Sequence, residues 1–143
     1  MLAPLIFMKG DNIMVVKTIK YTDYDGNERE ETFYFNLNEA EITEMQYEQV
    51  GGLREFLDKI TKSNDNVEIM KMFKKILLKA YGEKSADGRR LVKSEEISTA
   101  FTQTEAYNQL FLELVDGGDE AMSEFINAII PQSIKEKSIQ AIK

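Results

Sequence analysis

The sequence predicts a mainly α-helical domain that begins with a β-hairpin, an α+β fold by strict count. Two observations support this prediction. Residues 15–35 are rich in β-branched and aromatic residues around a central Asp-Gly pair. Residues 37–131 place apolar residues three and four apart, with glycine, proline and helix-capping residues between the runs. We therefore expect a β-hairpin over 14–36 and a compact bundle of about six short helices over 37–131.

Composition restricts the classes of function. The chain has 143 residues, of which 43% are hydrophobic, so one domain with a real core is expected over 14–131. A net charge of −7 argues against nucleic acid as the main partner, because phosphate binding needs a positive surface. The absence of cysteine and histidine removes disulfides, thiolate metal sites and the commonest general base. No apolar run approaches the roughly 20 residues of a membrane span. We expect a cytoplasmic protein without catalytic activity, cofactor or membrane segment.

Residues 1–13 do not match the rest of the chain. They contain Pro4 and Gly10, show no period, and precede Met14, which is a plausible true start. They lack the basic region and small-residue cleavage site of a signal peptide. We expect a flexible N-terminal extension.

The hairpin has two possible registers. A two-residue Asp25-Gly26 turn would pair Tyr24 with Asn27. A three-residue loop, with Gly26 left-handed in a bulge, would gather four apolar side chains on one face: Ile19, Tyr21, Phe33 and Phe35. We favour the second register for that reason. The acidic loop does not fit a calcium site, because Tyr34 takes the twelfth position that requires glutamate.

Capping residues divide the helical region. Asn38 and Glu41 form a capping-box pattern, and Gly51-Gly52 separates that helix from a short one over 53–60. Ser94 precedes a helix that runs to Phe101, and Thr104 precedes the next. That helix ends at Gly117-Gly118, and the last one stops at Pro131. Residues 132–143 are predicted to be a tail or weak helix, or a linker.

The longest helix is predicted over 67–81. Its apolar positions recur at helical spacing: Ile69, Met70, Phe73, Ile76, Leu77, Ala80 and Tyr81. Asn64 or Asp65 would cap its start, and Gly82 would end it as a left-handed C-cap residue. A polar loop, 83–93, is then expected.

That polar loop is the candidate contact site. Its charged residues are Lys84, Asp87, Arg89, Arg90 and Lys93. Two adjacent arginines beside Gly88 suit bidentate contacts with carboxylates of a partner. The sequence offers no nucleophile–base pair, so we expect a contact surface and not an active site.

Other patterns have simpler interpretations. Gly51-Gly52-Leu53-Arg54 could hold an anion, but without a P-loop lysine it is better explained as a helix boundary. The lysines of the long helix (Lys71, Lys74, Lys75 and Lys79) form either a docking stripe or a solvated face. The carboxylate pairs Glu28/Glu30 and Glu95/Glu96 lack the apolar surroundings that would raise a pKa. Helical methionines (Met45, Met70, Met72 and Met122) are either adaptable partner contacts or ordinary core.

The order of these segments resembles a known family. The segments are the hairpin, FYFNLNEAEITEM, GGL, ILLKAYGEKSADGRRLVKS, FTQTEAYNQLFLEL and AMSEFINAIIP. Together they are similar to the tail assembly chaperones of siphophages and prophages of Gram-positive bacteria. The resemblance covers roughly 17–131, and its most specific pieces are 81–90 (YGEKSADGRR) and 102–107 (TQTEAY). These signatures have no catalytic meaning.

The resemblance implies a non-enzymatic assembly factor. Such proteins coat the tape measure protein, keep it soluble, and hand it over as tail tube subunits polymerise around it. They act in the host bacterial cytoplasm and are absent from the mature virion. Many are made together with a longer frameshift form, and a homo-oligomer is possible. The alternatives are a structural or adaptor protein of the phage particle that oligomerises without chaperone activity, and a regulatory binding module.

Overall fold

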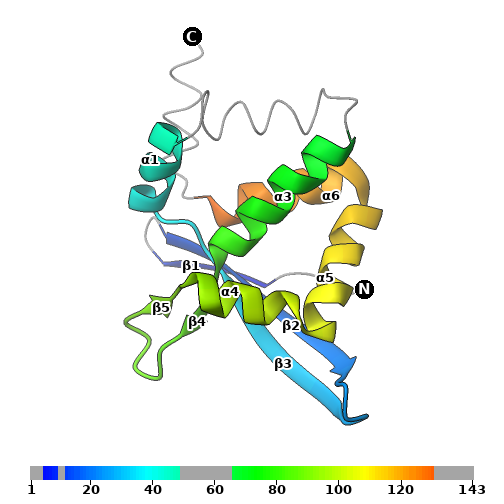
Figure 1. Cartoon of the computed structure of the whole chain (residues 1–143). Helices are drawn as coiled ribbons and strands as arrows, with labels where there is room; N and C mark the ends of the chain where they lie inside the picture. The colour runs from blue at the N-terminus through cyan, green and yellow to red at the C-terminus, as the bar shows by residue number, and fades with distance from the viewer. Residues whose placement is uncertain (1–4, 10–11, 49–65, 131–143) are drawn as a thin grey trace.

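The computed structural model describes residues 5–9, 12–48 and 66–130, which form an antiparallel sheet packed against helices (Figure 1). The strands lie in the order β1-β2-β3-β4-β5, with bounds Leu5–Lys9, Asn12–Thr22, Glu28–Phe35, Tyr81–Lys84 and Leu91–Val92. The described helices are α1 (Glu39–Glu48), α3 (Asn66–Ala80), α4 (Glu95–Thr102), α5 (Glu105–Asp116) and α6 (Gly118–Ile129). Every strand pairs with its neighbour in sequence, and α1 and α3 lie in the connection between β3 and β4.

The predicted register of the β2–β3 hairpin is confirmed. Val15 pairs with Phe35 and Tyr21 with Arg29, which continues to a three-residue loop between Asp23 and Asn27. The Asp23 amide donates to the Asn27 carbonyl (2.9 Å), and Gly26 has a φ of 87°. Since side chains alternate along a strand, this register places Ile19, Tyr21, Phe33 and Phe35 on one face.

The fold is α+β, as the sequence predicts by strict count, but the sheet is larger than predicted: five described strands take the place of a lone hairpin. Residues 1–13 were expected to be a flexible N-terminal extension. In the structure Leu5–Lys9 forms β1, because β2 begins at Asn12 and its backbone pairs with this segment, Leu5 opposite Val16. At the other side of the sheet, β4 pairs with β3, Phe35 opposite Tyr81, and β5 pairs with β4.

The long helix ends one residue earlier than predicted, and the residues that follow it form a strand. α3 ends at Ala80, and Tyr81 and Gly82 belong to β4. Gly82 is not among the glycines with positive φ. It is required for space, because a Cβ there would lie 2.6 Å from Cγ of Leu91 and 3.1 Å from Cγ of Lys93. Tyr81 fits the helical spacing of apolar residues and was therefore predicted to be helical, but it lies in β4. Its ring stacks on that of Phe101, with the ring centroids 4.0 Å apart.

Most predicted helix boundaries are confirmed. The amide of Glu41 donates to the Asn38 side chain, and the Glu41 carboxylate accepts from the Asn38 amide, which completes the capping box. Ser94 and Thr104 cap α4 and α5 through their hydroxyl oxygens. The predictions for Gly51-Gly52-Leu53-Arg54, the helix over 53–60, the caps Asn64 and Asp65, and the tail 132–143 lie outside the described residues.

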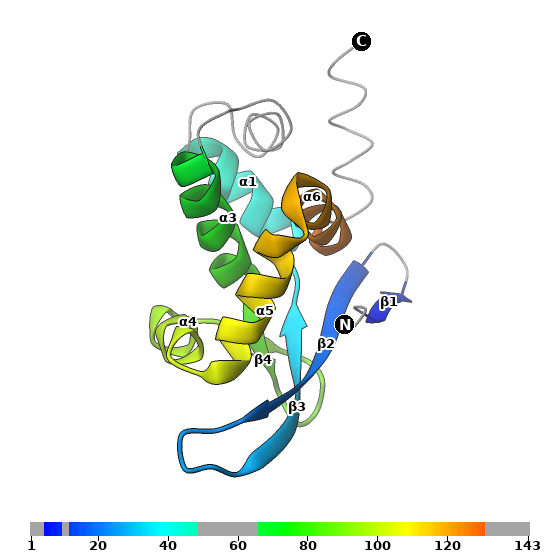
Figure 2. The same cartoon turned by 90° about the vertical axis from the view of Figure 1, so that its right-hand side faces the viewer.

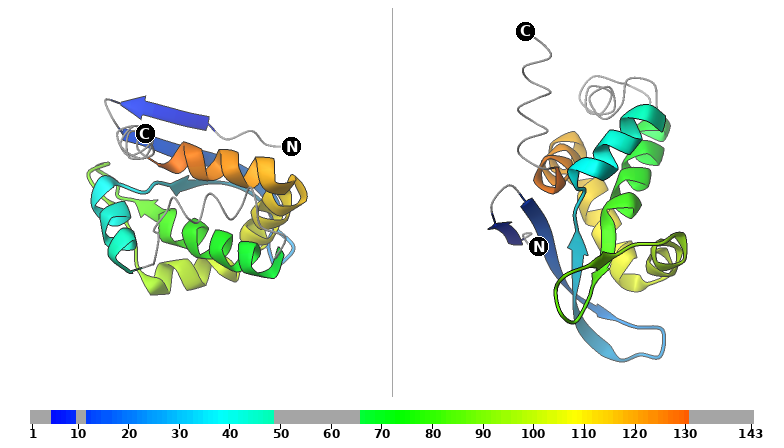
Figure 3. Two further views of the ribbon diagram at one scale, coloured as in Figure 1. Left: turned by 90° about the horizontal axis from the view of Figure 1, so that it is seen from above. Right: turned by 90° about the vertical axis from the view of Figure 1, so that its left-hand side faces the viewer.

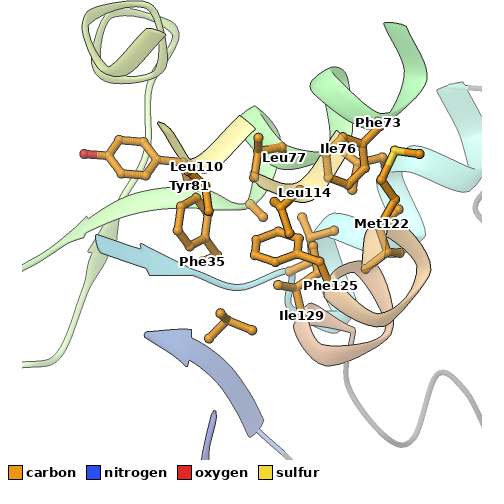
Figure 4. Packing of buried hydrophobic residues seen from close by; sticks show 14 of the residues in the cluster. Phe35, Phe73, Ile76, Leu77, Tyr81, Leu110, Leu114, Met122, Phe125 and Ile129 are labelled. Carbon is orange, nitrogen blue, oxygen red and sulfur yellow. The ribbon is translucent and has the colours of Figure 1, made fainter. Parts of the chain in front are cut away.

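The core lies between one face of the sheet and the helices. Phe35 and Tyr81 from the sheet face Leu77, Leu110 and Phe125 from three helices (Figure 4). Seen from above, β1 and β2 lie at one side of the molecule and α3 and α4 at the other, with α6 between them (Figure 3). Burial of large apolar side chains at roughly 25 cal/mol per Å² is the main favourable contribution to folding. Packing against the helices holds the sheet in place, and the β2–β3 and β4–β5 turns extend from this sheet.

Candidate partner-contact site

The predicted contact loop is a second β-hairpin. Lys84 pairs with Leu91 and Glu83 with Val92, so 85–90 form the turn between β4 and β5. The Ser85 amide donates to the Arg90 carbonyl, and the Gly88 amide donates to the Ser85 carbonyl, both at 2.9 Å. Gly88 has a φ of 75°, a conformation that glycine adopts without strain. The sequence missed this hairpin because β5 is only two residues long.

Asp87 stabilises this turn from within. Its Oδ1 accepts from the Arg89 amide (3.0 Å) and from the Ser85 hydroxyl (2.7 Å). These two hydrogen bonds lower the pKa of the Asp87 carboxyl below its ordinary value. The Ser85 hydroxyl oxygen in turn accepts from the Arg90 amide at 3.0 Å. Asp87 therefore orders the turn through two hydrogen bonds to its Oδ1.

Lys93 points into the protein. Its Nζ lies 2.8 Å from both carboxylate oxygens of Glu41 and 2.5 Å from the Asn36 carbonyl oxygen. Burial lowers the pKa of the Lys93 ammonium, and its hydrogen bond to Glu41 opposes that shift. The same Glu41 carboxylate belongs to the capping box of α1. Lys93 thus ties the end of β5 to the start of α1.

Four of the five predicted residues are exposed, and three of these four are cations. Arg89 and Arg90 are exposed, and their guanidinium groups make no ion pair with the residues that the structure describes. Lys84 is exposed on the outer face of the sheet, with Nζ 5.8 Å from the ring centroid of Tyr34. The end of β4 and the turn therefore present three cations on an ordered backbone.

The β2–β3 hairpin projects beyond the helices (Figure 2). Asp23 orders its tip by accepting from the amides of Asp25 and Asn27, both at 2.9 Å. Arg29 pairs with the same carboxylate at 2.5 Å. The pKa of Asp23 is lowered chiefly by Arg29 and then by the Asn27 amide. Tyr24 is 75% exposed, although its hydroxyl donates to Glu105 Oε1 on α5 at 3.2 Å.

A buried ion pair was not foreseen from the sequence. The Lys17 side chain is 4% exposed and its Nζ lies 2.6 Å from Oε2 of Glu113. Lys17 is on the inner face of β2, between the positions of Val15 and Ile19, and Glu113 is on α5. Strand alternation gave the only signal, since Lys17 has the same parity as its apolar neighbours. The pair joins the sheet to the helical layer.

The methionines have mixed environments. Met45 and Met122 are buried in the core, 2% and 6% exposed, whereas Met70 is 40% exposed. Val67, one turn before Met70 on α3, is 65% exposed, and Tyr47 on α1 is 89% exposed. These three residues form the exposed apolar set of α1 and α3.

No cluster of three or more Asp, Glu, His or Cys side chains suited to a metal ion occurs within 5–9, 12–48 and 66–130. Over the same ranges, no helix combines the length and apolar character required to cross a bilayer. An open cleft of about 490 Å³ lies between the β2–β3 hairpin and Gln109 of α5. Its walls are mainly charged hairpin side chains.

Comparison with known proteins identifies the family. A family model described as phage tail assembly chaperone matches residues 14–142. The match begins at Met14, after the segment predicted to be an extension, and covers the β2–β3 hairpin from Met14, the β4–β5 hairpin and all the described helices. Neither curated proteins nor solved structures gave a significant match. The chain belongs to the phage tail assembly chaperone family.

Proposed function

We propose that this protein coats the tape measure protein during tail assembly and helps to recruit tail tube subunits. The family match over 14–142 carries this proposal. The family's role is assembly and not catalysis, so its partners are tail proteins. In our proposal the protein acts in the host bacterial cytoplasm, together with a longer frameshift form of itself. It leaves before the virion is complete.

The exposed apolar set of α1 and α3 supports binding to a helical partner. Val67 and Met70 lie three residues apart on α3, which is the spacing of side chains along one face of a helix. A helix that docks on another helix uses apolar anchors at such spacings. Met70 adds an unbranched side chain that adapts to different surfaces. We assign the tape measure contact to this face.

Residues 84–90, the basic turn, are assigned a separate contact role. Lys84, Arg89 and Arg90 are exposed, and Asp87 holds the turn in one shape. A loop that already has its bound conformation loses less conformational entropy on binding than a flexible loop. Arginine pairs with carboxylates in bidentate geometry, so an acidic surface is the fitting partner. The sequence placed Asp87 and Lys93 in the same set; Asp87 is exposed but bonds within the turn, and Lys93 pairs with Glu41.

Co-expression with a tape measure protein tests the proposal. We expect the tape measure protein to become soluble and to co-elute with many copies of this chain in size-exclusion chromatography with light scattering. Val67→Asp combined with Met70→Asp should abolish co-elution, because two carboxylates would replace the apolar anchors. The matched control Asn108→Asp with Asn127→Asp adds the same two carboxylates at exposed positions of α5 and α6 and should retain co-elution. An insoluble tape measure protein, with this chain eluting alone, would refute the chaperone function.

The composition of purified particles separates chaperone from particle component. A chaperone is absent from finished virions, whereas a structural or adaptor protein remains in them. Detection of this chain by mass spectrometry at stoichiometric amounts in purified particles would replace the proposed function with a structural one.

A further inference from the structure

Two projections of the sheet carry opposite charge. We call residues 23–31 the acidic tip, which has five carboxylates against one guanidinium, a net charge of −4. We call residues 84–90 the basic turn, which has three cations against one carboxylate, a net charge of +2. A positive segment stands out in a chain whose total is −7. The two segments are therefore electrostatically complementary.

Both projections lie at the same end of the sheet. β3 pairs antiparallel with β2 and with β4, so β2 and β4 run in the same direction and their following turns leave the sheet at one end. Figure 1 shows the basic turn and the acidic tip at the bottom of the molecule, separated from each other. A second copy rotated by 180° about an axis through that end would bring each tip opposite the other copy's turn.

Charged groups that already bond within their own turn are less available for such a contact than those that do not. In the acidic tip, Asp23 and Glu31 accept hydrogen bonds from Arg29 and Tyr21, respectively. Asp25 and Glu28 are exposed, and their carboxylates make no ion pair with the described residues. In the basic turn the guanidinium groups described above are equally open. The free carboxylates and free guanidinium groups lie on two different ordered turns.

We propose that the partner of the basic turn is the acidic tip of a second copy of this chain, and that the reciprocal contact closes a two-fold dimer. Arg89 and Arg90 of each copy pair with Asp25 and Glu28 of the other. A two-fold interface requires a self-complementary surface, which one acidic and one basic projection at the same end provide. The inference deepens the contact role assigned above to the basic turn. It does not involve the tape measure face.

Charge exchange between two variants provides the test. One variant carries Arg89→Glu and Arg90→Glu, which makes both projections acidic. The other carries Asp25→Lys and Glu28→Lys, which opposes the acidic character of the tip and leaves the basic turn intact. Light scattering at about 0.05 M and about 0.5 M salt gives the mass, since surface charge pairs are screened at high salt. We expect a wild-type dimer at the lower salt, monomers for each variant alone, and a dimer when the variants are mixed.

Matched variants control for net charge. Lys74→Glu with Lys75→Glu changes the net charge as the arginine variant does, and Glu120→Lys with Glu124→Lys matches the tip variant; both should remain dimeric. Asp25→Asn with Glu28→Gln supplies a milder tip variant if the lysines disturb folding, and it should weaken the dimer. A monomeric wild type at low salt, or a mixture that stays monomeric, would overturn the inference. Species larger than a dimer would overturn the two-fold geometry. Because only this chain is present, failure here leaves the tape measure experiment untouched.

Discussion

The ion pair between Lys17 on β2 and Glu113 on α5 leads to a prediction: removing one partner should cost more stability than removing the other. The Lys17 side chain is 4% exposed, whereas that of Glu113 is 22% exposed. Glu113→Ala would leave an ammonium buried without this carboxylate, which is costly because a buried charge loses its hydration. Lys17→Met removes the buried charge and keeps an unbranched side chain of similar length, and the Glu113 carboxylate retains access to water. We expect Glu113→Ala to destabilise the protein more than Lys17→Met.

The magnitude follows from the burial of the two partners. Removing one partner of a fully buried pair costs about 3–5 kcal/mol. Because Glu113 is partly exposed, water reaches the site and we place Glu113→Ala at about 2–3 kcal/mol. At about 3 °C per kcal/mol for a domain of this size, the midpoint of thermal unfolding should fall by about 6–9 °C. Lys17→Met should change the free energy of unfolding by about 1 kcal/mol or less.

Urea denaturation followed by circular dichroism measures both variants and the double variant. Adding Lys17→Met to Glu113→Ala should recover stability, since the loss comes from a buried ammonium that lacks this carboxylate. Equal m-values would show that the unfolded states are comparable. If the two single variants cost the same, or if the double variant is as unstable as the two losses together, the assigned role of the pair is wrong.

Three further outcomes are expected. Gly82→Ala should cost about 1–3 kcal/mol in urea denaturation, because its Cβ would lie 2.6 Å from Cγ of Leu91; an unchanged midpoint would contradict the close packing. Lys93→Met should speed amide hydrogen exchange at the start of α1, because Glu41 loses its ammonium partner; unchanged exchange would show that the capping box suffices. Burial raises the pKa of Tyr81 to about 12, above the ordinary value of 10, so folding favours the neutral phenol. Its contribution should persist below about pH 10 and be lost as pH rises toward 12, visible by ultraviolet titration against Tyr81→Phe.

Local chemistry made several elements predictable. The hairpin register followed from the alternation of apolar residues and from Gly26, whose positive φ fixes the loop. Ser94 and Thr104 predicted helix starts because their hydroxyl groups cap by short-range hydrogen bonds. The arginines of the basic turn were predicted to be exposed because no apolar pattern includes them. These features depend on neighbours in sequence.

The errors arose where distant segments decide the structure. Gly82 matches a helix C-cap locally, yet its conformation is set by pairing with β3 and by Leu91 above it. Lys93 belongs to a polar run, and its burial depends on Glu41, which is 52 residues away. β1 has apolar composition without a period, so the backbone of β2 was needed to define it as a strand. The secondary-structure propensity of a segment carries no information about contacts with residues far away in the sequence.

The direct junction of α3 and β4 fixes the orientation of the longest described helix. Ala80 ends the helix and Tyr81 begins the strand, with no residue between them to absorb relative movement. The junction is pinned to the sheet, because the Asn36 amide donates to the Ala80 carbonyl at 2.9 Å and Tyr81 pairs with Phe35. The C-terminal end of α3 is therefore held to the sheet by backbone hydrogen bonds as well as by side-chain packing. The direction in which α3 presents Val67 and Met70 is set by the strand that follows it.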